Sequence, residues 1–178
     1  HWLTIIGATT EPQKIIPPLA DRFMIQPAFC EYSHDEMETI LRRQAAVAQV
    51  VIEGAEFGLL ARASAGTPRL AKRIILSARD LQVIHQRPPT AAEVLDLCGL
   101  DPDGLTVEHL QYLGVLDSRQ GQAGLKTLCT TLRMNESSVT QLERLLEKLR
   151  LVTFTDRGRI LTPNGIKKAR ELRAQAAA

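Results

Sequence analysis

The sequence contains few of the residues and patterns on which whole classes of protein depend. Three cysteines occur in 178 residues, at the widely spaced positions Cys30, Cys98 and Cys129. An odd and scattered set argues against a disulfide framework and fits a reducing cytoplasm, where we expect the protein to work. Because no C-x-x-C pair or Cys/His cluster is present, no metal site is predicted.

Two longer patterns are also missing. No apolar run approaches the roughly 20 residues that span a bilayer, and no signal peptide opens the chain, so no membrane partner is expected. There is also no G-x-x-x-x-G-K-[ST] loop and no acidic metal-binding strand. The chain alone is therefore not expected to hydrolyse ATP or to hold a nucleotide tightly.

What is present is an ordinary globular composition with an uneven distribution of charge. Hydrophobic residues make up 44% of the chain and charged residues 24%. Residues 1–141 hold 13 Lys/Arg against 16 Asp/Glu, whereas residues 142–178 hold 9 against 4. A basic end on a slightly acidic body favours an anionic partner, with nucleic acid as the first candidate. A solvated basic helix explains the charge equally well.

The first residues are predicted to be the edge of an α/β sheet. Leu3–Ile6 is short, apolar and rich in β-branched residues, as in a buried strand, and Phe23–Ile25 is predicted to be a second strand. Residues 15–21 are expected to turn around two prolines. These pieces are too few for a domain, and the chain enters the first strand without an initiator Met. We therefore interpret the chain as a piece of a longer protein.

Helices are predicted to dominate the rest of the chain. Ser33 and Glu36 form a capping box at the start of one helix, and Thr67 with Pro68 begins another. Further helices are expected at about 55–65, 91–97, 106–118, 124–132 and 136–149, and the best linker is 101–104.

The last part of the sequence has the pattern of a winged helix. Three helices are followed by the β-like segments Leu151–Thr155 and Ile160–Leu161, with a turn between them. A final helix is predicted after Thr162-Pro163. Three helices and a two-stranded hairpin together predict a winged helix-turn-helix.

Four short motifs stand out along the chain. They are Gly7-Ala8-Thr9-Thr10, Pro18-Leu19-Ala20-Asp21-Arg22-Phe23, Gly66-Thr67-Pro68-Arg69 and Thr155-Asp156-Arg157-Gly158-Arg159. In this order they resemble signatures of the RuvB family of AAA+ branch-migration ATPases. The resemblance implies a mainly α chain in three parts. These are the edge of the ATPase domain (residues 1–28), the helical lid (29–100) and a winged-helix DNA-binding domain (101–178).

The resemblance also implies roles at a nucleotide. Thr9 matches sensor 1, with Thr10 as the neighbouring possibility, because a polar side chain after a sheet strand reaches the γ-phosphate and its attacking water. Arg22 matches the arginine finger that acts across a subunit boundary, although a salt bridge is the other explanation of an Asp-Arg pair. Arg69 matches sensor 2, with Pro68 setting the helix start, and Tyr32 matches a tyrosine near the adenine.

For DNA, the resemblance points to the wing. Arg157, Gly158 and Arg159 at the hairpin tip are predicted to contact phosphates or enter a groove. Lys167 and Lys168 extend this predicted footprint, with a solvated helix face as the equal alternative. No base-reading pattern is present, and junction recognition by shape needs none.

Two positions depart from the family pattern. Ala20 stands where the family has arginine, which leaves the trans-acting network incomplete. Asp156 stands where the family has proline and adds a negative charge beside Arg157. Both departures fall at predicted functional ends of the chain.

The resemblance implies that the intact protein is a homohexameric, ATP- and Mg²⁺-dependent motor on four-way junction and duplex DNA. Its expected partners are the junction-binding subunit of the same pathway and, later, the resolving nuclease. Two alternatives stay open from the sequence. One is a stand-alone winged-helix DNA-binding module, which explains only residues 101–178. The other is a different AAA+ protein, such as a replication initiator or a clamp-loader subunit.

Overall fold

The computed structural model describes residues 3–156 and 158–176, with side chains as far as residue 172. The chain divides into two units, an N-terminal segment up to Glu31 and a compact unit that begins at Tyr32. The second unit contains all the α-helices of more than one turn and all the strands that the described residues form.

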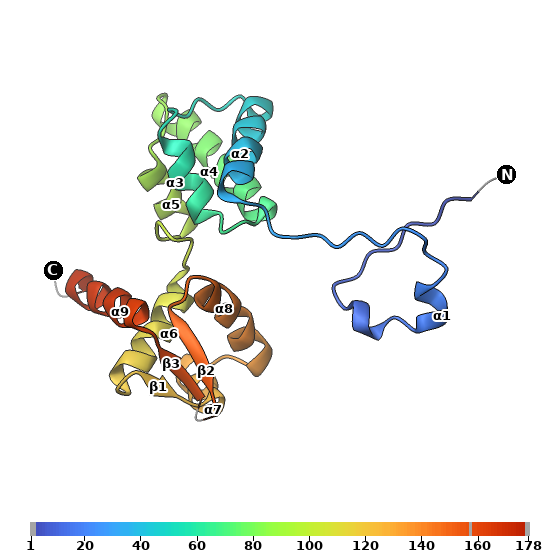
Figure 1. The fold of residues 1–178 in the computed structure, drawn as a ribbon. Coiled ribbons are helices and arrows are strands. Elements are labelled where there is room, and N and C mark those ends of the chain that lie inside the picture. The colour runs from blue at the N-terminus through green and yellow to red at the C-terminus, as the bar shows by residue number, and fades with distance from the viewer. Residues whose placement is uncertain (1–2, 157, 177–178) are drawn as a thin grey trace. The chain divides into compact units, whose positions relative to one another are not determined.

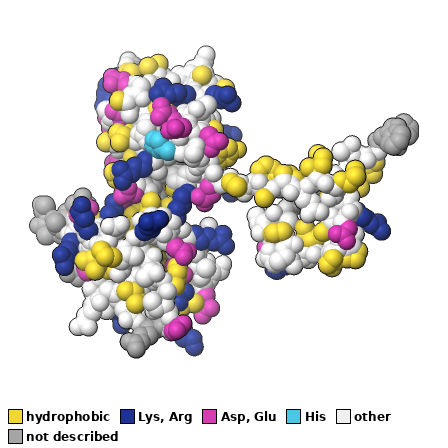
Figure 2. All heavy atoms as spheres, in the orientation of Figure 1, with side chains coloured by type: hydrophobic (Ala, Val, Ile, Leu, Met, Phe, Trp, Pro, Cys, Tyr) yellow, Lys and Arg dark blue, Asp and Glu magenta, His cyan; other side chains and the backbone are white. Residues whose placement is uncertain are grey.

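The N-terminal segment contains only a 3-10 helix, η1 (Pro12–Lys14), and a single helical turn, α1 (Pro17–Ala20). The predicted strands at 3–6 and 23–25 are wrong, because neither segment has regular strand structure. A β-branched run becomes a strand only when a neighbour accepts its backbone hydrogen bonds, and no described strand pairs with it. Its apolar side chains are left exposed, as the yellow spheres of Figure 2 show.

The turn predicted at residues 15–21 is instead the helical turn α1. Proline already has the φ of the first helical position and needs no hydrogen-bond partner for its nitrogen, so Pro17 and Pro18 favour a helix start. The Asp21 N–H closes the turn on the carbonyl of Pro17 at 2.9 Å. The difference is local and leaves the predicted arginine exposed just after the turn.

The lid consists of four helices at the start of the second unit (Figure 1). These are α2 (His34–Ala48), α3 (Glu56–Ala63), α4 (Pro68–His85) and α5 (Ala91–Cys98). The predicted capping box of Ser33 and Glu36 is confirmed, and Thr90 forms a second one with Glu93. Met37 and Leu41 on α2 pack with Ile74 on α4 in one buried core.

The winged helix follows and has its own core. Its helices are α6 (Val107–Ser118), α7 (Leu125–Leu132), α8 (Glu136–Lys148) and α9 (Pro163–Ala176). Its strands are β1 (Gln122–Ala123), β2 (Val152–Thr155) and β3 (Gly158–Leu161), in the order β1-β3-β2 and all antiparallel. Tyr112, Leu128 and Leu146 are fully buried between these elements. The predicted winged-helix architecture is confirmed.

The wing has one strand more than the two-stranded hairpin predicted from the sequence. Gln122 pairs with Ile160 and Ala123 with Arg159, so the hairpin becomes a three-stranded sheet. Two residues are too short for a period-2 pattern, and flanking glycines resemble a turn. The added strand braces the wing along the edge opposite β2.

Candidate nucleotide-facing and DNA-facing sites

The two predicted catalytic residues lie in the N-terminal segment and make local contacts there. Thr9 accepts a hydrogen bond on its Oγ1 from the Glu11 N–H at 3.0 Å. Arg22 is exposed, and no described acidic side chain pairs with it, so the salt bridge that the sequence left open is not formed within the described residues. Their roles at a nucleotide stay predictions.

Arg69 lies in the first turn of the 18-residue helix α4 and is exposed. Thr67 is the N-cap, with extended backbone angles, and Pro68 follows at the first helical position, as predicted. The Thr67 side chain makes no capping hydrogen bond, so the N–H groups of this turn are not capped by it. A helix start of this kind favours an anion, and an arginine beside it fits a nucleotide phosphate.

Tyr32 is half-exposed at the start of the compact unit. It lies on a cavity of about 180 Å³ whose other lining residues include Arg62, Asp103 and Lys148. Arg69 does not line this cavity. The tyrosine therefore faces the boundary between lid and winged helix, and its predicted place near an adenine stays a prediction.

The wing turn depends on glycine at position 158. Gly158 has φ +122°, and a Cβ there would lie 2.6 Å from the backbone oxygen of Ala123 in β1. Only glycine tolerates both the backbone angle and the close approach. Asp156 is exposed next to the turn, and Arg157 lies outside the described residues. The predicted DNA contact of Arg157 therefore remains a prediction.

Arg159, also predicted to contact DNA, faces the interior of the winged helix. Its Nε donates to Glu143 Oε1 at 2.7 Å and its Nη2 donates to Glu143 Oε2 at 3.2 Å. The Tyr112 hydroxyl donates to the same carboxylate at 2.9 Å, and Glu143 is 3% exposed. A guanidinium held in this way by a buried carboxylate joins β3 to helices α6 and α8.

Electrostatics in this cluster favour the ion pair. The hydrogen bond to Glu143 raises the pKa of Arg159 further above its ordinary value. Burial, together with the charge of Glu143, raises the pKa of Tyr112, which therefore stays a neutral donor. The three side chains form one satisfied polar network in an otherwise apolar core.

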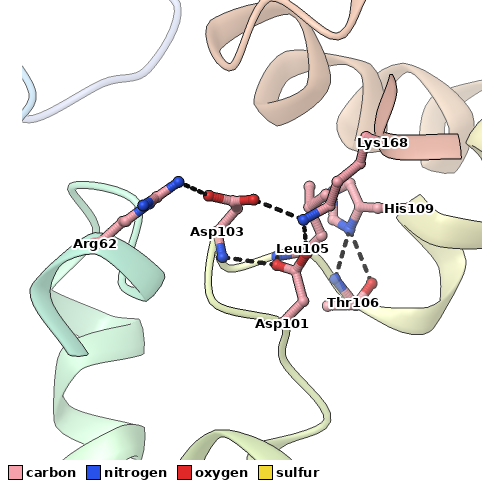
Figure 3. Close-up of polar contacts among 7 residues, drawn as sticks. All are labelled: Arg62, Asp101, Asp103, Leu105, Thr106, His109 and Lys168. Atoms are coloured by element: carbon pink, nitrogen blue, oxygen red, sulfur yellow. Dashed lines mark hydrogen bonds and ion pairs between the residues drawn. The ribbon is translucent and has the colours of Figure 1, made fainter. Parts of the chain in front are cut away.

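The two adjacent lysines of α9 have different surroundings. Lys167 is exposed, and no described acidic side chain pairs with it. Lys168 is largely buried, with its Nζ 2.6 Å from Asp101 Oδ2 and 2.7 Å from Asp103 Oδ2 (Figure 3). Burial alone would lower the pKa of Lys168, but its hydrogen bonds to these two aspartates raise it. Of the two lysines, only Lys167 presents its charge to solvent.

Sequence reasoning missed the acidic partners of these cations. Glu143 stands on the buried stripe of α8, four residues after Val139 and three before Leu146. A carboxylate in an apolar stripe is the signal that should have indicated a buried cationic partner. Asp101 and Asp103 were treated only as turn residues of a linker, and nothing in the local pattern indicated Lys168, 65 residues from Asp103.

Across residues 3–156 and 158–176, no group of three or more His, Cys, Asp or Glu side chains is arranged to hold a metal ion. None of the helices in that part of the chain is long and apolar enough to cross a membrane.

The fold is therefore that of an AAA+ lid domain of four helices, followed by a winged-helix domain of the DNA-binding class. Residues 32–98 match the RuvB AAA lid domain, and residues 102–169 match the RuvB C-terminal winged helix domain. The chain belongs to the RuvB family. This result favours RuvB over the other AAA+ proteins and over an unrelated winged-helix module.

Individual relatives agree with the domain matches. The chain is 32% identical over 168 residues to the Holliday junction branch migration complex subunit RuvB of Prochlorococcus marinus (strain NATL2A), covering 90% of the chain and 47% of the relative. The RuvB subunit of Thermosipho melanesiensis is 33% identical over 181 residues, covering 95% and 58%. The chain thus spans about half the length of these relatives.

Solved structures give the same result. The Thermotoga maritima RuvB Holliday junction branch migration motor superposes with a TM-score of 0.76 at 27% identity, covering 88% of this chain and 55% of that one. A single-residue variant of the same protein gives a TM-score of 0.75 at 26% identity. The lid and winged helix described above are therefore similar to those of solved RuvB structures.

Proposed function

We propose that the chain is the lid and DNA-contacting part of an ATP-driven motor that moves the branch point of a Holliday junction in recombination and repair. The observation that carries this proposal is one compact unit in which a lid helix, with exposed Arg69 in its first turn, is joined to a winged helix. The matched relatives are named as subunits of a Holliday junction branch migration complex, which supports it.

In the intact protein, ATP with Mg²⁺ supplies the phosphoryl transfer that drives movement. Arg69 contacts the γ-phosphate from its own subunit, and Pro68 holds the start of the helix in place. Tyr32 lies near the adenine. Thr9 positions the attacking water, and Arg22 stabilises phosphate charge across a subunit boundary of a homohexamer. The exposure of Arg69 and Arg22 supports these assignments.

The chain by itself supplies sensors, lid and DNA contacts but not the phosphate-binding loop. No G-x-x-x-x-G-K-[ST] sequence occurs in its 178 residues. We assign residues 1–28 to the edge of the ATPase domain, 29–100 to the lid and 101–178 to the winged helix. Alone, the chain is expected to turn over no ATP.

On the DNA side, Arg157, Gly158 and Lys167 form the phosphate-contacting surface of the winged helix. Arg159 and Lys168 are not part of this surface, because Arg159 forms an ion pair with Glu143 and Lys168 forms ion pairs with the two linker aspartates. Contact with phosphates rather than bases suits a four-way junction, which differs from duplex DNA in shape. The junction-binding subunit and the resolving nuclease are the protein partners of this assembly.

The nucleotide half of the proposal is tested by Arg69→Ala in the intact protein. ATP turnover is expected to fall by about 100-fold, as when one preorganised donor to developing charge is removed. Arg79→Ala is the matched control, since Arg79 is exposed on the same helix and pairs only with Asp80 among described residues. Wild-type turnover in the Arg69 variant would rule out the sensor assignment.

The DNA half is tested with this chain and two DNAs of equal length, a four-way junction and a linear duplex. Binding to the junction is expected to be the tighter and to weaken steeply as salt rises. Equally negligible binding to both DNAs would remove the DNA role of the winged helix.

A further inference from the structure

The segment between lid and winged helix is a folded joint. Leu100 is buried in the lid core and Leu105 is buried in the core of the winged helix, so only four residues separate the two cores. The Asp101 carboxylate accepts hydrogen bonds from the N–H groups of Asp103 and Leu105, at 2.9 and 2.8 Å (Figure 3). The Asp101 N–H in turn donates to the Leu105 carbonyl at 2.9 Å.

Basic side chains from both the winged helix and the lid contact this joint. From the winged helix, Lys168 contacts Asp101 and Asp103, and from the lid, Arg62 forms an ion pair with Asp103 (Figure 3). The Arg62 pair is solvent-exposed on the lid side, so by itself it contributes little. The lysine is enclosed by two carboxylates and holds the turn to α9.

The tightest contact is between two backbones. Gly104 has φ +82°, and a Cβ at this position would lie 2.3 Å from the carbonyl oxygen of Ala63, the last residue of α3. No side chain fits at that distance, so the linker lies directly on the end of a lid helix. Lys148 of α8 makes a second contact there, donating to the Ala65 carbonyl at 2.9 Å.

Both contacts fall on one short stretch of the lid, formed by the last residue of α3 and the loop after it. The joint contacts Ala63 and the winged helix contacts Ala65, and the same stretch continues through Gly66 and Thr67 into Arg69 in the first turn of α4. Ala65 and Gly66 both have positive φ, 51° and 74°, so the loop turns sharply within two residues. Five residues therefore separate Ala63, the point contacted by Gly104, from the arginine assigned to the nucleotide.

We propose that loop 63–67 and the folded joint 101–104 hold the winged helix in a fixed position on the lid. A lid movement caused by nucleotide at Arg69 then moves the winged helix, and the DNA that it contacts, together with the lid. This rests on the proposed motor function. Gly104, Lys148 and Arg62 are positioning residues in this scheme, since the proposed function assigns none of them to nucleotide or DNA. Loss of the joint uncouples hydrolysis from movement and leaves both cores intact.

The test is Gly104→Ala in the intact protein, with Gly99→Ala as its matched control. Gly99 also has positive φ, +65°, but nothing lies within 4 Å of a Cβ there, so only the Gly104 variant adds a collision with the lid. We expect Gly104→Ala to lower branch migration per ATP hydrolysed at least fivefold, with ATP turnover within twofold of wild type. The Gly99 variant is expected to keep the wild-type ratio. An unchanged ratio in Gly104→Ala overturns the proposal.

A second variant covers the possibility that Gly104→Ala does not fold. Arg62→Ala combined with Lys148→Ala removes two side-chain contacts across the joint and touches neither core. The same drop in migration per ATP is expected, in smaller measure. A wild-type ratio in this double variant also counts against the joint.

A distance measurement separates failure of the joint from failure of the motor. Spin labels replace exposed Val47 on α2 and Thr140 on α8, in a chain whose three cysteines are changed to alanine. Pulsed electron paramagnetic resonance measures the distance between the two labels. We expect one narrow distribution of this distance, and we expect Gly104→Ala to broaden it. A broad distribution without that substitution overturns the joint. An intact protein that moves no junction, but has the narrow distribution, overturns the proposed function alone.

Discussion

Arg159 and Glu143 form a two-point ion pair in the interior of the winged helix, between β3 and α8. Glu143 is 3% exposed and is also bonded to the Tyr112 hydroxyl, so the pair and the tyrosine connect the wing to two helices. An arginine that the motif suggested for DNA contact therefore has a partner of its own. The role that follows is to hold the wing.

Removing the carboxylate should destabilise the domain strongly. Glu143→Ala leaves the Arg159 guanidinium and the Tyr112 hydroxyl without their shared acceptor, so the free energy of unfolding is expected to fall by about 3–5 kcal/mol. Urea unfolding measures it. Glu147→Ala, four residues along α8 and exposed, is expected to change stability by no more than about 0.5 kcal/mol. Equal small effects at both positions would contradict a structural role for Glu143.

Salt dependence distinguishes a wing-holding arginine from a phosphate ligand. Each phosphate contact contributes about 0.9 to the slope of log binding constant against log salt. Lys167→Ala is therefore expected to reduce the slope by about 0.9, because Lys167 is exposed. Arg159→Ala is expected to weaken binding with the slope unchanged. A slope reduced by about 0.9 in Arg159→Ala would instead make it a phosphate ligand.

The lid should lose stability in acid through Glu93. Its hydrogen bonds to Arg87 and to the Thr90 backbone lower its pKa from 4.5 to about 2. Since the folded pKa is the lower one, this stabilisation is complete above pH 4.5 and is lost as pH falls toward 2. The free energy of unfolding of the Glu93→Gln variant should therefore change less between pH 4.5 and pH 2 than that of the unsubstituted chain. A carboxyl resonance of Glu93 titrating near 4.5 would contradict the pairing.

Elements with local signals were predictable from the sequence. Ser33 with Glu36, and Pro68 after Thr67, determine helix starts through contacts within a few residues, and both are present. The helix expected at about 136–149 is likewise present as α8, with Val139 and Leu146 in the core.

Features that depend on distant partners were not predictable. A lysine or arginine has the same charge whether its partner is a phosphate or a carboxylate, so Arg159 and Lys168 resembled DNA contacts. Their partners lie 16 and 65 residues away. The strand predicted at Leu3–Ile6 is wrong for a related reason, because strand propensity cannot supply a neighbouring strand.

A trans-acting arginine has a particular kinetic signature. Arg22→Ala in the intact protein is expected to lower ATP turnover by about 10³-fold, because charge on the transferring phosphoryl group is no longer stabilised. When the Arg22→Ala protein is mixed with a variant that has Arg22 but a defective phosphate-binding loop, ATP turnover should be regained. The reason is that an intact phosphate-binding loop in one subunit then faces an intact Arg22 of its neighbour. Unchanged turnover in Arg22→Ala, or no regain on mixing, would contradict the assignment.

The most direct test of the motor is movement of a synthetic four-way junction by the intact protein with its junction-binding partner. With ATP and Mg²⁺, labelled arms are expected to separate into two duplexes, and a non-hydrolysable ATP analogue should support binding without separation. Arm separation equally fast with the analogue, or absent with ATP while turnover continues, would contradict the assignment of this chain to a branch-migration motor.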